Sequence, residues 1–165
     1  MLLVADFGDA PDPGVGTGIG NYQTLLGSGG PSHGIVTTQT TLFLGARVDD
    51  EAEATSNVQA NGDDITTLPD DEDGLIEPAQ DLVLTVGSAP VVRVRAQNTS
   101  GSSATLYGWI DYSRDGVFDN ATERTMTVVP SGTINGTFTL VFPSIPTGTA
   151  AGTTYARFRL STDIA

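Results

Sequence analysis

Residues 111–123 read DYSRDGVFDNATE, and their first half carries an oxygen-bearing side chain at every second position. Asp111, Ser113 and Asp115 alternate in this way, and Gly116 follows directly. Calcium takes about six to eight oxygen ligands at about 2.3–2.6 Å, and a glycine permits the sharp turn that aims successive oxygens inward. The spacing therefore predicts that this acidic loop, residues 111–123, wraps a Ca²⁺ ion.

The acidic loop resembles an EF-hand loop but departs from it in two ways. Counted from Asp111, the carbonyl of Val117 and the side chain of Asp119 occupy ligand positions, but the final acid, Glu123, comes one residue late. The flanking segments are apolar and β-branched, which predicts strands rather than the two helices of an EF-hand. We expect a calcium loop that joins two β-strands. The alternative is an acidic turn that binds no metal.

The acidic residues of the whole chain are gathered into clusters. Of the twenty Asp and Glu residues, nineteen lie in residues 6–12, 49–81 or 111–123, and the exception is Asp163. Clustered carboxylates repel one another and stay ionised only beside a partner. The chain has seven arginines, no lysine and a formal net charge of −13. Because the arginines are too few, divalent cations are the expected partners.

The composition also excludes several classes of function. Nucleic acids and anionic membrane surfaces both need basic patches, so neither is an expected partner. No run of sequence is long and apolar enough for insertion across a membrane. The absence of cysteine excludes disulfides, and the absence of lysine excludes isopeptide cross-links. Metal binding remains as the expected strong cross-link, because an ion that binds the folded chain and not the unfolded chain stabilises the fold.

The second half of the chain carries the pattern of an all-β protein. Short apolar segments recur about every ten residues between glycine, serine, proline or asparagine, which is typical of a sandwich or barrel. Val92, Val94 and Ala96 alternate with two arginines, which places them on one face of a strand. No segment has a helical period. The predicted strands cover residues 42–48, 82–86, 91–97, 105–110, 125–129, 137–142 and 154–160.

We therefore expect one antiparallel β-sandwich domain of jelly-roll or immunoglobulin-like type over residues 1–165. Residues 1–80 form its acidic, loop-rich, metal-binding part, and residues 81–165 supply the core strands. The glycine-rich residues 13–34 are predicted to be loop. Residues 49–73 have little apolar content, so we expect them to become compact only when cations replace the missing core.

Several stretches together resemble the GEVED-type β-sandwich modules of large secreted bacterial proteins, which often stand beside the phrase DFGDAPD. The resemblance covers nearly the whole chain in collinear order. It implies an adhesin-like, secreted or cell-surface multidomain protein, a β-sandwich, and calcium binding. Ser113 departs from the pattern, since such loops more often carry Asn or Asp there. The matching stretches are residues 6–12, 44–53, 62–64, 70–74, 98–101, 108–123 and 153–162.

The resemblance also implies a second group of calcium ligands, away from the acidic loop. By motif, Asp6 and Asp9 are expected to pair with acids from residues 49–73 and to hold one or more Ca²⁺ ions. The full set of expected ligands is Asp6, Asp9, Asp49, Glu51, Asp63, Asp64, Asp71, Glu72, Asp73, Asp111, Ser113, Asp115, Val117 (through its carbonyl oxygen), Asp119 and Glu123.

Three classes of function are weighed. The leading expectation is a non-catalytic, monomeric calcium-binding module that acts as a rigid spacer or a ligand-presenting adhesin domain, with neighbouring domains of the same large protein as partners. The alternative is a calcium-dependent module that binds a glycan or surface peptide and is attached to a secreted hydrolase. Sugars stack on exposed aromatic rings, and the candidates are Tyr22, Tyr107, Tyr112 and Tyr155.

An enzyme is the least favoured class. The chain has no cysteine or lysine nucleophile, and His33 is its only histidine. The pattern G-x-S-x-G occurs at residues 30–34, but it lies in the glycine-rich stretch predicted to be loop and not at the strand-to-helix turn that carries the nucleophile of a serine hydrolase. A carboxylate pair for glycoside hydrolysis stays open, but calcium would occupy the acids that are clustered.

Overall fold

A computed structural model describes residues 5–34, 41–46, 56–62 and 74–163 of the chain. These residues form two compact units. The first unit contains residues 5–34, 56–62 and 114–117, and the second contains residues 41–46, 74–113 and 118–163. The second unit thus includes residues 41–46 and 74–80, which the sequence analysis assigned to the acidic, loop-rich part. In the described ranges, no helix has the length and apolar character needed to cross a membrane.

The first unit consists mostly of loops. Strands β1 (Ala5–Phe7) and β2 (Ser32–Gly34) pair antiparallel, and a short 3₁₀ helix, η1 (Leu26–Ser28), precedes β2. The carbonyl oxygen of Pro11 accepts a hydrogen bond from the Tyr22 amide at 2.7 Å. The prediction that residues 13–34 are loop is therefore wrong for β2 and η1. Backbone pairing with β1 overrides the low strand propensity of glycine there.

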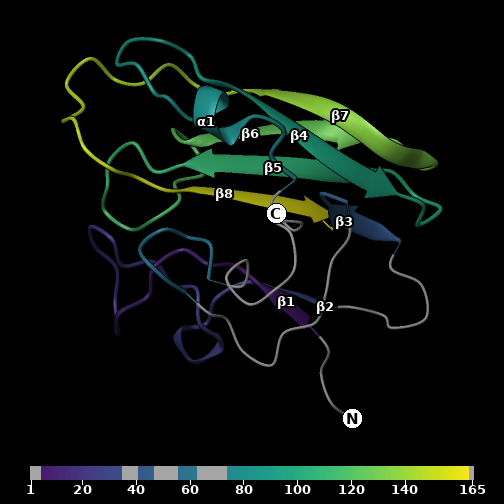
Figure 1. Ribbon diagram of the computed structural model, residues 1–165, viewed down its shortest axis with the longest axis horizontal. Coiled ribbons are helices and arrows are strands. Elements are labelled where there is room, and N and C mark those ends of the chain that lie inside the picture. The colour runs from purple at the N-terminus through teal and green to yellow at the C-terminus, as the bar shows by residue number, and fades with distance from the viewer. Residues whose placement is uncertain (1–4, 35–40, 47–55, 63–73, 164–165) are drawn as a thin grey trace. The chain divides into compact units, whose positions relative to one another are not determined.

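The second unit is an antiparallel β-sandwich, which confirms the predicted fold class (Figure 1). One three-stranded sheet has the order β3-β4-β7, and the other has the order β6-β5-β8. Helix α1 is a single turn that precedes β4. The bounds are β3 (Leu42–Leu44), α1 (Pro78–Asp81), β4 (Val91–Asn98), β5 (Ala104–Ile110), β6 (Arg124–Val129), β7 (Thr133–Val141) and β8 (Ala156–Ser161).

The core of the sandwich lies between its two sheets. Val92 and Val94 of β4 are fully buried, as the alternation in the sequence predicted. Leu106 and Ile110 of β5 meet them from the other sheet, in one continuous apolar cluster. The removal of these side chains from water is the main stabilising force of the unit, at about 25 cal/mol per Å² of apolar surface.

The predicted strand at residues 82–86 is wrong. These residues follow α1, and the edge of β4 is covered by other groups. The Arg95 amide donates to the Gly74 carbonyl oxygen at 2.7 Å. The Arg93 amide donates to Oδ2 of Asp81 at 3.0 Å, so a side-chain carboxylate ends the ladder where a strand would continue it. Pro78 starts the helical turn that brings Asp81 to this position.

Candidate metal centre

The acidic loop connects β5 to β6, as predicted, and both of its ends are fixed by backbone hydrogen bonds. The Ile110 amide donates to the Glu123 carbonyl oxygen at 3.2 Å, and the Asp111 amide donates to the Tyr155 carbonyl oxygen at 3.1 Å. The Thr154 hydroxyl also donates to the Asp111 carbonyl oxygen. The chain just before β8 therefore holds the start of the loop in place.

Two carboxylates of the loop are buried in the sandwich unit. Asp111 is fully buried and Glu123 is 3% exposed. The Ser113 hydroxyl donates to Oδ1 of Asp111 at 3.1 Å, and the Ser113 amide donates to Oε1 of Glu123 at 2.9 Å. Oε2 of Glu123 accepts the amide of Asp119 at 3.0 Å. Ser113 therefore contacts both buried acids, and Glu123 ties the two halves of the loop together.

The electrostatics of this pair indicate excess negative charge. Burial raises the pKa of Glu123, and the charge of Asp111 raises it further, against the lowering effect of the Asp119 and Ser113 amides. Burial raises the pKa of the Tyr112 hydroxyl as well, and the charge of Glu123 adds to this. A cation placed beside the two carboxylates would relieve their repulsion.

Two further predicted ligands of the loop use their carboxylates locally. Oδ1 of Asp119 accepts the amides of Ala121 and Thr122, both at 2.8 Å, and the Thr122 hydroxyl at 2.9 Å. The Thr122 hydroxyl is the main reason that the pKa of Asp119 lies below its usual value. Oδ1 of Asp115 accepts the Val117 amide at 2.9 Å. Each of these carboxylates therefore stabilises a turn of the loop.

The glycine of the loop is needed for two reasons. Gly116 has a φ of +79°, which side-chain-bearing residues rarely adopt. A Cβ atom at this position would also lie 2.3 Å from the carbonyl oxygen of Asn21 and 2.5 Å from the amide nitrogen of Gly18. Residues 114–117 belong to the first unit, so this close contact lies within that unit.

The predicted ligand set is thus only partly brought together. Asp111, Ser113 and Glu123 are in contact, and within the described ranges no three Asp, Glu or His side chains converge closely enough to hold a metal ion. Asp9 is half-buried, and its carbonyl oxygen accepts the Asn57 amide at 3.1 Å. Outside the described residues lie Asp49, Glu51, Asp63, Asp64, Asp71, Glu72 and Asp73, and the side chain of Asp6 is likewise not described.

Trp109 is buried, but on the side of β5 that faces away from the sandwich core. Its ring stacks on Tyr107, with centroids 5.7 Å apart, and its indole N–H donates to Oδ1 of Asn120 at 2.9 Å. Arg124 lies over the Tyr107 ring at 5.6 Å. Sequence reasoning did not identify Asn120 as the partner of this indole. Side chains alternate between the two faces of a strand, so the inward position of Leu106 implies that Trp109, three residues later, lies on the opposite face of β5.

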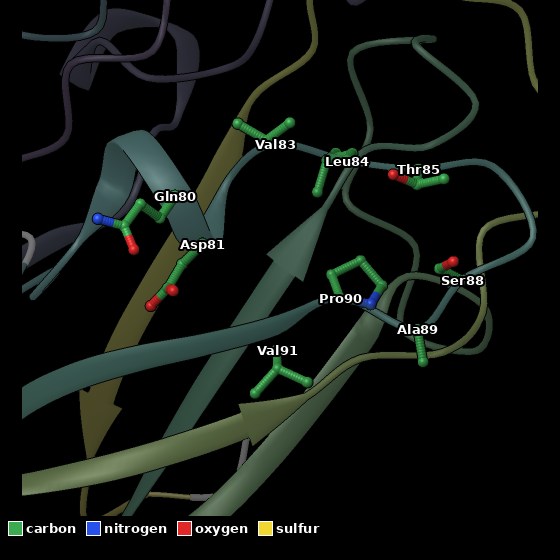
Figure 2. A pocket seen from close by; sticks show the side chains of 9 residues that line it. All are labelled: Gln80, Asp81, Val83, Leu84, Thr85, Ser88, Ala89, Pro90 and Val91. Carbon is green, nitrogen blue, oxygen red and sulfur yellow. The ribbon is translucent and has the colours of Figure 1, made fainter.

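A shallow pocket of about 200 Å³ lies beside α1 and the start of β4 (Figure 2). Figure 2 shows Asp81 and Gln80 at one end, and Ser88 and Ala89 at the other. Asp81 is the only ionisable residue that lines the pocket. Both of its oxygens bond to Arg93, at 2.8 Å and 3.1 Å, so the pocket offers no group for acid–base chemistry.

Comparison with known proteins gives one match. Residues 105–165 match the family model described as the GEVED domain. The matched region starts in β5, includes the acidic loop and extends through β8, so the resemblance expected from the sequence is confirmed over these residues. The N-terminal DFGDAPD motif lies outside the matched region. No curated protein and no solved structure matches the chain.

Proposed function

We propose, starting from the match of residues 105–165 to the GEVED domain, that this chain is a non-catalytic calcium-binding module. It acts as a rigid spacer or a ligand-presenting, adhesin-like domain in a secreted or cell-surface bacterial protein. Its neighbours are further domains of that same large protein. The family resemblance supports calcium binding and a place in a secreted or cell-surface multidomain protein.

The observation that carries the proposal is the buried pair Asp111 and Glu123. Two carboxylates in one protein interior remain ionised only if a positive charge balances them. The sequence of the loop supplies hydroxyl, carboxylate and carbonyl oxygens and contains no sulfur or imidazole group. This is the donor chemistry of Ca²⁺ rather than of zinc or copper. Ser113, which contacts both acids, is well placed to be a third ligand.

A bound Ca²⁺ would neutralise the pair and fasten the start of the acidic loop to its end. The loop would then hold β5 and β6 in a fixed register at this edge of the sandwich. Extracellular calcium modules typically have dissociation constants of about 10⁻⁴–10⁻³ M. At such affinities the module would be rigid in a calcium-rich exterior and looser during export.

The sugar-binding alternative gains no support from the aromatic residues. Tyr22, Tyr107 and Tyr112 are buried, and Tyr155 is half-buried. The three buried rings present no open face of the kind on which a pyranose stacks. We therefore retain the calcium-binding spacer or adhesin module as the proposed function.

Thermal unfolding in EDTA and in excess Ca²⁺ tests the proposal. At a Ca²⁺ concentration of about 10–100 times Kd, binding to the folded state alone adds about 1.4–2.7 kcal/mol of stability. We expect the unfolding midpoint to rise with Ca²⁺ in the wild-type chain and to rise less in Asp111→Asn. The matched control is Asp163→Asn, which removes one exposed carboxylate outside the clusters and should respond like wild type. An unchanged wild-type midpoint would refute the proposal.

A further inference from the structure

Three buried oxygen atoms of the first unit make no hydrogen bond: Oδ1 of Asp12, Oδ1 of Asn21 and Oγ1 of Thr24. Thr24 is fully buried, and Asp12 is 7% exposed. A buried polar atom without a partner costs free energy, and native proteins leave few of them. Three such oxygens on two neighbouring segments therefore indicate a missing partner.

Hydrogen bonds bring together the two chain segments that carry these residues. The Tyr22 amide donates to the Pro11 carbonyl oxygen at 2.7 Å. Oδ2 of Asp12 accepts the amides of Thr24 and Leu25, at 3.0 Å and 2.9 Å. Asp12 and Thr24 are thus bonded to each other directly, and Asn21 directly precedes Tyr22, which is bonded to the neighbour of Asp12. The amides of Thr24 and Leu25 use Oδ2 of Asp12, and Oδ1 has no hydrogen-bond partner.

The Asp12 carboxylate is held in its ionised form. Burial acts to raise its pKa, but hydrogen bonds from the amides of Leu25, Thr24 and Gly14 and from the Ser28 hydroxyl more than offset this. The pKa of Asp12 therefore lies below its usual value. The first unit thus contains a buried, negatively charged carboxylate, and the uncharged side-chain oxygens of Asn21 and Thr24 belong to the same pair of segments.

We propose that Asp12, Asn21 and Thr24 form a calcium site in the first unit, with ligands other than those predicted in the acidic loop. Oδ1 of Asp12, Oδ1 of Asn21 and Oγ1 of Thr24 are its side-chain ligands, and backbone carbonyls or water complete the shell of oxygens that Ca²⁺ requires. The choice of Ca²⁺ rests on the proposed function. With a single carboxylate the site is weak, since calcium affinity follows the number of charged ligands.

Thr24→Val is the sharpest test, because valine has nearly the shape of threonine and lacks the oxygen. Equilibrium dialysis of the full chain against Ca²⁺ measures the number of ions bound per chain. We expect Thr24→Val to bind one Ca²⁺ fewer than the wild type. An equal number of ions in the two proteins would overturn the site.

The same variant gives a second readout with opposite signs. In EDTA, Thr24→Val removes a buried hydroxyl that lacks a partner, so its unfolding midpoint should equal or exceed that of the wild type. In saturating Ca²⁺, its midpoint should fall below that of the wild type. A Thr24→Val chain that gains as much from Ca²⁺ as the wild type does would contradict the proposal.

Asn21→Asp tests the site by gain of affinity. A second carboxylate should tighten Ca²⁺ binding if Asn21 is a ligand, and the midpoint in EDTA should fall because two acids then repel each other. Unchanged Ca²⁺ affinity would count against the site. Asp111→Asn separates this inference from the proposed function. If that variant binds as many ions as the wild type while Thr24→Val binds fewer, the loop site fails and the site in the first unit stands.

Discussion

The two units of the chain bury different kinds of atoms. In the described part of the sandwich, buried polar side chains have partners. Asn98, which is fully buried, donates to the carbonyl oxygens of Ser102 and Val129 at 2.8 Å and 2.9 Å and accepts the amide of Ser100 at 3.1 Å. The first unit contributes no described residue to the apolar core cluster, and it contains the three unpartnered oxygens of Asp12, Asn21 and Thr24.

This difference separates two sources of stability. Apolar burial stabilises the sandwich strands whether or not metal is present. The first unit has little apolar interior, so its buried oxygens need an ion to become favourable. We expect substitutions in the sandwich core to act equally with and without Ca²⁺, and those in the acidic loop and the first unit to depend on it.

The largest effect should come from the sandwich core. Leu106→Ala removes a fully buried side chain from the middle of β5 and should lower the free energy of unfolding by about 2–5 kcal/mol. Denaturant unfolding in EDTA and in Ca²⁺ should give the same loss. Met126→Ala on neighbouring β6, where the side chain is 61% exposed, should change stability by no more than about 0.5 kcal/mol. A loss of unfolding free energy in Leu106→Ala that differs between EDTA and Ca²⁺ would contradict the claim that the stability of the sandwich core is independent of calcium.

Gly116→Ala should be strongly destabilising in the first unit. The left-handed backbone and the contact with Asn21 together predict a loss of about 1–3 kcal/mol. Gly14→Ala is the matched control, because a Cβ there meets nothing within 4 Å. If both variants melt alike, the close packing of residues 18–21 against Gly116 is not a feature of the folded protein.

Asp81→Asn should cost about 1–3 kcal/mol at neutral pH, since Asp81 binds both the amide and the guanidinium of Arg93. The hydrogen bond from the Arg93 side chain lowers the pKa of Asp81 below its usual 3.8. This contribution is therefore present above the unfolded-state pKa and is lost as the pH falls through the folded-state pKa. Denaturant unfolding at several pH values should show wild type and variant converging in acid. Glu77→Gln, at 3.6 Å from Arg93 and half-exposed, should have little effect.

The smallest effect concerns Glu123, whose pKa is raised above its usual 4.5. Because its pKa is raised in the folded state, protonated Glu123 stabilises the fold. This stabilisation is fully present below the unfolded-state pKa of Glu123 and is lost as the pH rises through the folded-state pKa. In EDTA, stability should therefore decline over that range, and saturating Ca²⁺ should remove the decline. Thermal unfolding as a function of pH in the two buffers measures it. A decline that persists in Ca²⁺ would mean that no cation balances Glu123.

The regular part of the sandwich could be predicted from the sequence because strand alternation is a local signal. Val92, Val94 and Ala96 lie inside for that reason. The same signal failed at residues 82–86, where α1 and the Asp81 carboxylate cover the edge of β4. Their pairing depends on contacts remote in sequence, which no local pattern encodes.

The candidate site was predictable in its position but not in its detailed contacts. Alternating oxygens located the loop between two strands, and Asp111, Ser113 and Glu123 do come together. The hold of Thr154 on Asp111 joins residues 43 positions apart, so the sequence gives no sign of it. Asn21 and Thr24 escaped notice because neutral polar residues are common in any loop.

Calcium titration followed by the fluorescence of Trp109 tests the central claim most directly. Trp109 is the only tryptophan in the chain, and its indole bonds to Asn120 inside the acidic loop, so its emission reports on that site. We predict a saturable change with a midpoint of about 10⁻⁴–10⁻³ M Ca²⁺, absent in Asp111→Asn and retained in Asp163→Asn. Emission that does not respond to Ca²⁺, or that responds identically in Asp111→Asn, would contradict the account.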